Sequence, residues 1–459
     1  MLMQNTRPAE RAQRTFISTR NACKLCSPLG ASIAYRGIEK CVPLIHGSQG
    51  CATYIRRYVI SHFKEPIDIA SSNVSEEGAI FGGGENFKKA LDNIARQYQP
   101  SLIGVATTCL SETIGDDVKF YLEQYRAGKA GFGMPEIVHA STPSYRGTHM
   151  DGFHEAVSAV VRALARRGEK HDGINLLPGF VSCEDLRILK SACEAFGLSC
   201  TILPDYSETL DGESWQEYQK LSTGGTKIDD IRRMGGARAT IQLGTIGTAG
   251  ESVAAWLERK FGVRNFALLL PVGVMQTDRL MEIFSELSGL PLPGQLAGER
   301  GRLIDSYIDG HKYVFGKKAA IYGEADFICA VAAFLEEIGM VPAVCATGAK
   351  AADLKQSLER LLENTHPGMQ AIDDTDFASL EGICKEAGVD ILIGNSKGYW
   401  LARRLGIPLV RAGFPVHDRI GGQRLAHLGY TGAQQLFDRI VNTMIEHQQN
   451  SSPVGYSYM

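Results

Sequence analysis

Short apolar segments with strand character recur along most of the chain, and stretches with helical periodicity separate them. The segments are SLIGVATT, EIVHAST, INLLPGF, SCTILPD, ATIQLG, FALLLPVG, AAIYG, PAVCATG, DILIGNS and IPLVRAGFP. Runs of this kind, apolar without alternation, are typical of strands buried on both faces of a sheet. Between them, DGFHEAVSAVVRALARR places one apolar stripe on a helix: Phe153, Val157, Val160, Val161 and Leu164. The alternation predicts an α/β protein with mostly parallel sheets.

About ten such strands are too many for a single nucleotide-binding type of unit. Two polar or Pro/Gly-rich stretches, ARRGEKHDG and GLPLPGQLAGERG, divide the pattern. We therefore expect three Rossmann-like domains, over residues 1–170, 171–310 and 311–459. The last of these should end in a helix over TGAQQLFDRIVNTMIEHQQ.

Composition places the chain among soluble globular proteins. Of 459 residues, 44% are hydrophobic and 22% are charged, with a net charge of -3. This balance gives no sign of a nucleic-acid or anionic-membrane partner. MLMQNTRPAERAQRTF lacks the apolar core of a secretory signal, and no apolar stretch approaches the roughly 20 residues of a membrane span. The sequence predicts a cytoplasmic protein, in which the 11 cysteines are not expected to form a disulfide framework.

Several cysteines instead occupy positions suited to metal binding. In TTCLSETIGDD, Cys109 lies where a predicted strand ends and a helix begins. Cys51 follows the glycine loop HGSQG and begins the helical pattern ATYIRRYVISHF, while Ser144 in TPSYRGTH follows another predicted strand. Ligand sites of open α/β sheets lie outside the carboxyl ends of the strands, and a helix N-terminus favours the thiolate form of cysteine. These positions predict thiolates available to a metal.

The pair Cys23 and Cys26 forms a Cys-x-x-Cys motif, which fits a redox pair, half of a zinc site, or one ligand beside a bystander. No second close pair of ligands follows, which disfavours zinc. Iron–sulfur clusters tolerate dispersed ligands better. Cys26, Cys51 and Cys109 are one thiolate short of a conventional cluster, so the chain or a partner must supply another. The remaining cysteines are interpreted as core residues: Cys41, Cys183, Cys193, Cys200, Cys329, Cys345 and Cys384.

Three further polar features carry weaker signals. His46 before Gly47 is expected to satisfy a loop carbonyl. FGGGEN lacks the Lys-Ser/Thr pair of a phosphate-binding loop and is interpreted as a turn into a helix. Asp305 and Asp309 lie four apart on one helical face, which fits either a solvated surface or a site for a hard cation.

Taken together, the motifs resemble one family. They are CSPLGA, PLIHGSQGC, SHFKEP, IFGGGEN, TTCLSETIGDD, TPSYRGTH, GGTKIDD, ERGRLID and RAGFPVHDR. In this order, and over nearly the whole chain, they resemble the β chain of nitrogenase component 1. The resemblance implies the three-domain component 1 fold and an assembly of two α and two β chains. It also implies an [8Fe-7S] P-cluster shared across each α–β interface and an ATP-dependent iron protein as the transient reductase.

The same resemblance assigns roles to single residues. Cys26, Cys51 and Cys109 match the three P-cluster thiolates of the β chain, and Ser144 matches the serine that ligates iron when the cluster is oxidised. Tyr54 matches a tyrosine near that cluster. Cys23 has no counterpart in the family pattern.

A second metal site is implied between the two β chains. Glu65 matches a ligand of a mononuclear divalent cation, together with the carbonyl of Lys64. Asp305 and Asp309 would come from the other β chain. Oxygen ligands of this kind suit a hard divalent cation.

The chain also departs from the family pattern. ATYIRRYVISHF differs from the molybdenum-type β chain, and DIASSNVSEEGAIFG is closer to the vanadium-type and iron-only chains. These departures favour a divergent branch similar to the methylthio-alkane reductases, which cleave carbon–sulfur bonds, slightly ahead of a dinitrogen reductase. The alternatives are a non-catalytic β-like subunit of the cofactor-assembly scaffold and a zinc-stabilised binding protein. Retention of all three cysteines and the serine favours a reductase subunit that relays electrons and has no catalytic acid or base of its own.

Overall fold

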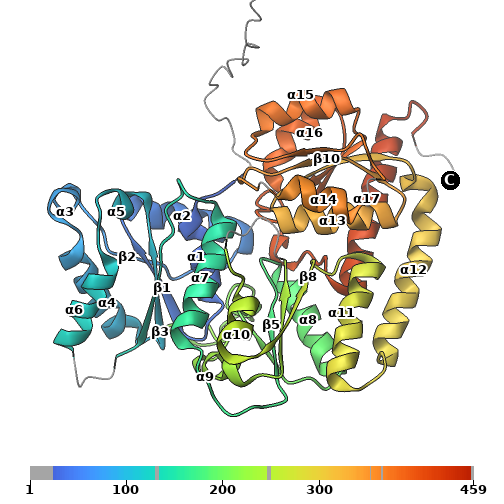
Figure 1. Ribbon diagram of the computed structural model, residues 1–459. Helices are drawn as coiled ribbons and strands as arrows, with labels where there is room; N and C mark the ends of the chain where they lie inside the picture. Colours follow the sequence, from blue (N-terminus) through green and yellow to red (C-terminus); the bar gives the residue numbers. More distant parts are fainter. Residues whose placement is uncertain (1–23, 130–133, 245–249, 352, 363–364, 456–459) are drawn as a thin grey trace, which may run out of the picture.

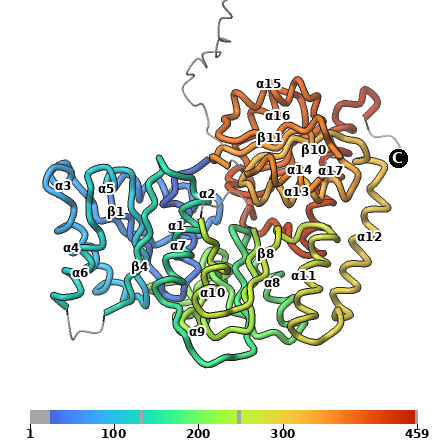
Figure 2. Tube along the Cα trace, in the orientation of Figure 1, coloured from blue at the N-terminus to red at the C-terminus, as the bar shows by residue number. Residues whose placement is uncertain are grey.

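A computed structural model describes residues 24–129, 134–244, 250–351, 353–362 and 365–455. Its strands form three separate sheets in which every strand pair is parallel, and helices cover the sheets (Figure 1). The three units follow one another along the chain, as the colours of Figure 2 show. The expected α/β class with mostly parallel sheets is confirmed.

The first unit has the strand order β2-β1-β3-β4. Its strands are β1 (Cys41–His46), β2 (Ala70–Ser71), β3 (Leu102–Thr107) and β4 (Glu136–Ala140). Its helices are α1 (Ser27–Arg36), α2 (Gln49–Phe63), α3 (Glu76–Phe81), α4 (Gly84–Tyr98), α5 (Cys109–Thr113), α6 (Val118–Gly128) and α7 (His149–Leu164). Every residue of β1 and β3 is buried, as expected for central strands covered on both faces.

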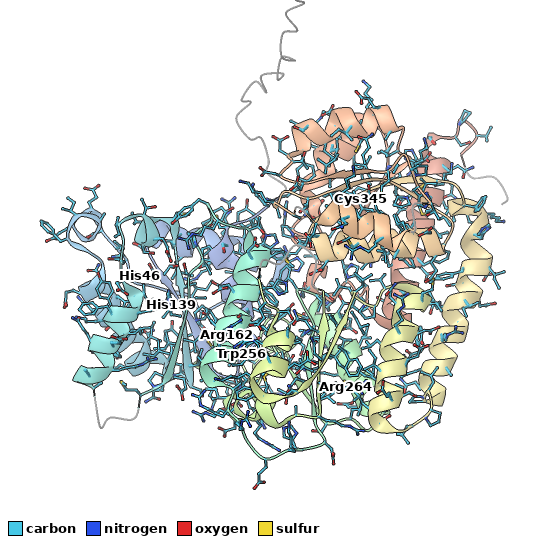
Figure 3. The ribbon with its side chains drawn as sticks, in the orientation of Figure 1. His46, His139, Arg162, Trp256, Arg264 and Cys345 are labelled. Atoms are coloured by element: carbon cyan, nitrogen blue, oxygen red, sulfur yellow. The ribbon has the colours of Figure 1, made fainter. Side chains whose placement is uncertain are left out.

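The second unit has the order β6-β5-β7-β8. Its strands are β5 (Ile174–Leu177), β6 (Cys200–Ile202), β7 (Ala239–Leu243) and β8 (Arg264–Leu268). Its helices are α8 (Cys183–Ala195), α9 (Ile228–Arg233), the 3₁₀ turn η1 (Met234–Gly236), α10 (Val253–Phe261) and α11 (Gly273–Ser288). Figure 3 shows Arg162 of α7 beside Trp256 of α10, with the guanidinium 5.3 Å from the ring centroid. This cation–π contact joins the first two units.

The third unit has the order β11-β10-β9-β12-β13. Its strands are β9 (Lys318–Tyr322), β10 (Val341–Ala346), β11 (Gln370–Ile372), β12 (Ile391–Gly394) and β13 (Leu409–Arg411). Its helices are α13 (Ala325–Glu337), α14 (Leu354–Leu361), α15 (Phe377–Ala387), η2 (Ser396–Gly398), α16 (Tyr399–Leu405) and η3 (Gly422–Arg424).

Two long helices join the second and third units, one as the chain connection between them and the other by packing. α12 (Gly294–Val314) lies along one edge of the molecule in Figure 1, and α17 (Gly429–Ser451) packs against α12, α11 and α8. The predicted C-terminal helix is present as α17, and its Leu436 and Ile440 are fully buried. Because α12 crosses residue 310 and α17 packs on helices of the second unit, the boundaries at 170 and 310 stay predictions.

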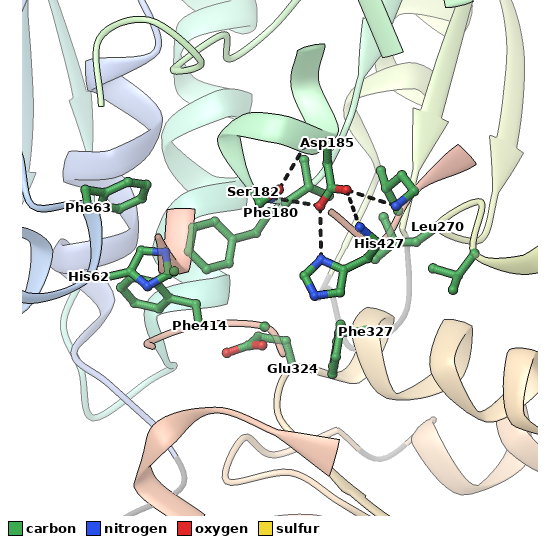
Figure 4. A pocket seen from close by; sticks show the side chains of 15 residues that line it. His62, Phe63, Phe180, Ser182, Asp185, Leu270, Glu324, Phe327, Phe414 and His427 are labelled. Carbon is green, nitrogen blue, oxygen red and sulfur yellow. Dashed lines mark hydrogen bonds and ion pairs between the residues drawn. The ribbon is translucent and has the colours of Figure 1, made fainter. Parts of the chain in front are cut away.

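The three units meet at a small pocket lined mainly by apolar and aromatic side chains, shown in Figure 4. One hydrogen-bonded acid fixes this junction. Asp185 of α8 accepts hydrogen bonds from the backbone N–H groups of His427 (2.7 Å) and Leu428 (2.9 Å), and it pairs with the His427 ring at 3.2 Å. Glu324, at the start of α13, pairs with Nε2 of His149 in the first unit at 2.8 Å. Within the described residues, no helix is long and apolar enough to cross a bilayer.

Candidate metal centre

Three thiols lie at the beginnings of three helices in the first unit. Cys26 is the N-cap residue of α1, Cys51 lies in the first turn of α2, and Cys109 is the first residue of α5. α2 and α5 follow the parallel neighbours β1 and β3, so Cys51 and Cys109 leave the sheet at the same edge. An isolated antiparallel bridge between Cys26 and Thr148 brings the start of α1 to the start of α7.

Short contacts join Cys26, Cys109 and Ser144, and Cys51 lies near enough to influence Cys26. The N–H of Ser144 donates to Sγ of Cys109 at 3.2 Å, and the N–H of Ser27 donates to Oγ of Ser144 at 3.1 Å. Burial raises the pKa of the Cys26 thiol, a hydrogen bond with Ser144 lowers it, and the charges of Cys109 and Cys51 raise it. Mutual electrostatic influence of this kind requires the groups to be near one another. The structure therefore brings together Cys26, Cys51, Cys109 and Ser144.

The loops that carry Cys51 and Cys109 are tied to each other through His46. Its carbonyl accepts hydrogen bonds from Thr108 Oγ1 at 3.1 Å and from Ser111 Oγ at 2.8 Å, next to the capping box that begins α5. The buried His46 ring pairs with Asp116 at 2.9 Å and contacts Ser72 Oγ at 3.0 Å. The expectation that this side chain satisfies a loop carbonyl was therefore wrong. The ring is bonded to side chains because Asp116, from the IGDD motif, folds back onto the end of β1.

Glu112 ties the Cys109 helix to the strand that leads to Ser144. One oxygen of its carboxylate accepts hydrogen bonds from Thr107 Oγ1 and Ser141 Oγ, both at 2.6 Å. Thr142 adds two more bonds to Thr107, at 2.9 Å through its N–H and at 2.7 Å through its hydroxyl. Glu112 was not among the predicted site residues, although its place one helical turn after Cys109 was a readable signal.

The donor set of this centre consists of three thiols and one hydroxyl group. Within the described residues, no three His, Cys, Asp or Glu side chains surround one metal position. Cys26 and Cys51 are partly buried, and Cys109 is exposed. Thiolates are the ligands that iron–sulfur clusters use. A group of three thiols at the surface is compatible with such a cluster, provided that a second chain completes it.

Tyr54 lies next to this group, on the first turns of α2. It packs against Tyr58 with 4.6 Å between ring centroids. Burial raises the pKa of Tyr54, and the charge of Cys26 contributes in the same direction. This influence places the phenol near Cys26, as the resemblance implied.

The three carboxylates predicted for a second metal do not meet within one chain. Glu65 follows Lys64, which ends α2 in the left-handed conformation with φ 63°. Burial raises the pKa of Glu65, and the charge of Asp211 adds to the rise. Asp305 and Asp309 are exposed on α12. A site shared between two β chains therefore stays a prediction.

The other cysteines lie mostly in the core. Six are buried: Cys41, Cys183, Cys193, Cys329, Cys345 and Cys384. Cys200 is only partly buried, and Cys23 lies outside the described residues. Burial raises the pKa of Cys345 to about 12, so this thiol stays protonated at neutral pH. The FGGGEN motif is the predicted turn into a helix, with Gly83 as the N-cap of α4.

Comparisons with known proteins agree with this arrangement. Residues 26–445 match the family described as nitrogenase component 1 type oxidoreductase. The nitrogenase molybdenum-iron protein beta chain of Clostridium pasteurianum is 38% identical over 449 residues, covering 97% of each chain. A nitrogenase iron-molybdenum cofactor biosynthesis protein, NifN of Bradyrhizobium diazoefficiens, is 33% identical over 94% of this chain and 91% of its own. The solved structure titled "Nitrogenase Cp1 at pH 6.5" superposes with a TM-score of 0.93 at 37% identity, covering 98% of this chain and 99% of that one.

Proposed function

This chain belongs to the nitrogenase component 1 type oxidoreductase family, and we propose that it is the β-type, electron-relaying subunit of a component 1 reductase. The observation that carries the proposal is the grouping of Cys26, Cys51, Cys109 and Ser144 at the surface of the first unit. The three thiols lie at the starts of three helices of that unit.

The group is open on one side, and a partner completes it in our proposal. Cys26, Cys51 and Cys109 bind one half of an [8Fe-7S] P-cluster, and an α-type subunit supplies the other thiolates. Two α and two β chains form the assembly, and an ATP-dependent iron protein is its transient electron donor. Bound iron and sulfide supply one-electron storage. The residues of this chain hold the cluster, and Ser144 offers a harder oxygen ligand to oxidised iron.

Dinitrogen reduction and carbon–sulfur bond cleavage are the two candidate reactions of the assembly. The similarity to nitrogenase molybdenum-iron protein beta chains favours dinitrogen. The departures in the DIASSNVSEEGAIFG segment favour the branch similar to methylthio-alkane reductases. In this proposal the choice rests on the α-type partner, which holds the cofactor. We also propose a cytoplasmic location for the assembly.

A second candidate function is the β-like subunit of the cofactor-assembly scaffold. The 33% identity to the NifN protein of Bradyrhizobium diazoefficiens is the observation in its favour. Such a subunit is not catalytic and would hold a conventional four-iron cluster. Ser144 and all three cysteines are retained, which supports the reductase.

We also propose a divalent cation between the two β chains, held by Glu65 and the Lys64 carbonyl of one chain and by Asp305 and Asp309 of the other. Carboxylate and carbonyl oxygens suit calcium, magnesium, manganese or iron(II).

Iron analysis of the purified α–β complex tests the proposed function. The reductase predicts about eight interface irons per α–β pair, beyond those of the α-subunit cofactor, and an oxidation-dependent EPR signal from a cluster that takes part in turnover. An interface cluster of only four irons, without reductase activity toward dinitrogen or methyl thioethers, would establish the scaffold instead. Zinc without iron, and no visible absorption near about 400 nm, would exclude both.

A further inference from the structure

Lys397 comes from the third unit but reaches the metal centre of the first. It lies in η2, directly after β12, where the backbone is held firmly. Its N–H donates to Oδ1 of the buried Asn395 at 3.1 Å, and a Cβ added at Gly398 would lie 2.0 Å from the Tyr322 hydroxyl. The packing on both sides leaves the backbone of this turn little freedom, so the fold fixes the point from which the Lys397 side chain extends.

The ammonium group of Lys397 ends beside the chain that leads into Cys26. Nζ donates to the carbonyl of Lys24 at 3.2 Å and lies 5.8 Å from the ring centroid of Tyr58. Since Lys24 precedes Cys26 by two residues, backbone dimensions put Nζ within about 12 Å of the Cys26 sulfur. Tyr58 in turn packs against Tyr54, the phenol influenced by Cys26.

We propose that Lys397 is a positioning residue of the metal centre, whose positive charge raises the reduction potential of the cluster bound at Cys26. This proposal rests on the proposed function. Reduction adds one electron, from the iron protein or from a chemical reductant, and makes the cluster more negative without requiring a proton at Lys397. A nearby cation stabilises that more negative state. Net charge around the cluster is one of the properties that set iron–sulfur potentials.

Two carboxylates near this part of the chain are paired with other cations. The carboxylate of Asp418 is held by Arg411 through contacts of 2.7–3.0 Å, and Lys24 is paired with Asp374 at 2.9 Å. The ammonium group of Lys397 therefore lies against the chain segment that leads into Cys26.

Redox titration of the purified α–β complex, followed by EPR, separates two effects of Lys397 on the cluster potential. One is its positive charge, and the other is its hydrogen bond to the Lys24 carbonyl, which we call the tether. Lys397→Met removes both, Lys397→Gln keeps a hydrogen-bond donor without the charge, and Lys397→Arg keeps the charge. Lys355→Met is the matched control, because its side chain is 72% exposed on α14 and pairs with Glu359 one turn away. Iron per α–β pair is measured for each variant.

We expect the midpoint potential to become more negative in Lys397→Met and Lys397→Gln, with parental values in Lys397→Arg and Lys355→Met and full iron in all four. Parental potentials in Lys397→Met and Lys397→Gln would overturn the proposal. A shift in Lys397→Met that Lys397→Gln restores would also overturn it, because the tether alone would then explain the effect. A parent complex without interface iron is a different failure, that of the proposed function.

Discussion

Cys26, Cys51 and Cys109 differ from the core cysteines in what surrounds the sulfur. Cys41 is enclosed at the start of β1, and burial raises its pKa to about 12. Cys109 instead is exposed and accepts a hydrogen bond from the Ser144 N–H. Sequence reasoning predicted the six buried cysteines as core residues, because a thiol within an apolar run differs in pattern from a thiol between a strand and a helix; Cys200, also predicted as core, is only partly buried. It could not find Lys397, which reaches the site from a distant unit.

Ser144→Ala tests the oxygen ligand at the residue scale. Binding of the serine oxygen to oxidised iron releases its proton, so the potential of that step should depend on pH. We expect the variant to assemble the reduced cluster but to lose this pH dependence in redox titrations at several pH values. Loss of the acceptor for the Ser27 N–H should cost about 1 kcal/mol of stability.

Ser141→Ala is the control. Ser141 lies three residues before Ser144, and its hydroxyl donates a hydrogen bond to Glu112 of α5. A pH dependence that survives in Ser144→Ala would reduce Ser144 to a residue that shapes the turn.

At the scale of elements, the crossing of α1 and α7 positions Cys26. The two helices come into close contact at two glycines. A Cβ at Gly30 would lie 1.7 Å from the His149 carbonyl oxygen, and a Cβ at Gly152 would lie 1.9 Å from the Ser27 carbonyl oxygen. Since both obstacles are backbone atoms, Gly30→Ala forces the helices apart. We expect a loss of about 3 kcal/mol or more in unfolding experiments, and less bound iron.

Gly382→Ala provides the matched control, because this α15 glycine has open space around its Cβ position. Replacement there should be neutral or stabilising by about 0.5–1 kcal/mol. Equal stability of the two variants would contradict the importance of the α1–α7 crossing.

The surroundings of Asp185 predict how the stability of the junction between the three units depends on pH. Burial raises the pKa of this carboxyl, but the hydrogen bonds and charge of His427 outweigh burial and hold the pKa below its usual value. A carboxyl with a lowered folded-state pKa stabilises the protein above about pH 4, and this contribution is lost as the pH falls further. Asp185→Asn should therefore cost about 1–3 kcal/mol at neutral pH, and less in acid.

Denaturant unfolding of the complex at several pH values measures this difference. Asp229→Asn, whose side chain is 84% exposed, should change stability little at any pH. A cost of Asp185→Asn that stays constant below pH 4 would show that the charge is not what stabilises the junction.

Strand β1 shows which part of the fold the apolar pattern missed. Its sequence CVPLIH was not among the predicted strands, although it is central in the first sheet. Proline removes a ladder donor and argues against a central strand. The strand tolerates Pro43 because pairing with β2 begins only at Leu44. Strands β2 and β11 were also not among the predicted strands, because neither AS nor QAI belongs to a longer apolar run.

At the scale of the whole molecule, the exposed face of α12 is the feature that the single chain leaves unexplained. Ile308 is 72% exposed between Asp305 and Asp309. The spacing of Asp305 and Asp309 fits either a solvated surface or a cation site, and we propose the cation site at the contact between two β chains. We expect Asp305→Asn with Asp309→Asn to separate the assembly into α–β halves while the iron of each half is retained.

Mass photometry with and without a chelator measures this separation, and Glu359→Gln on the exposed face of α14 is the control. A four-chain complex that binds as much divalent metal as the parent would show that these aspartates form only a solvated helix face.

The central claim is that three thiols of this chain hold an iron–sulfur cluster together with a partner. The most direct measurement is iron per α–β pair in Cys51→Ala, with Cys329→Ala as the control, because Cys329 is a buried core thiol of α13. We predict that Cys51→Ala loses the interface iron, its EPR signal and the reductase activity, while Cys329→Ala keeps the iron. A Cys51→Ala complex with full iron and full activity would contradict the account.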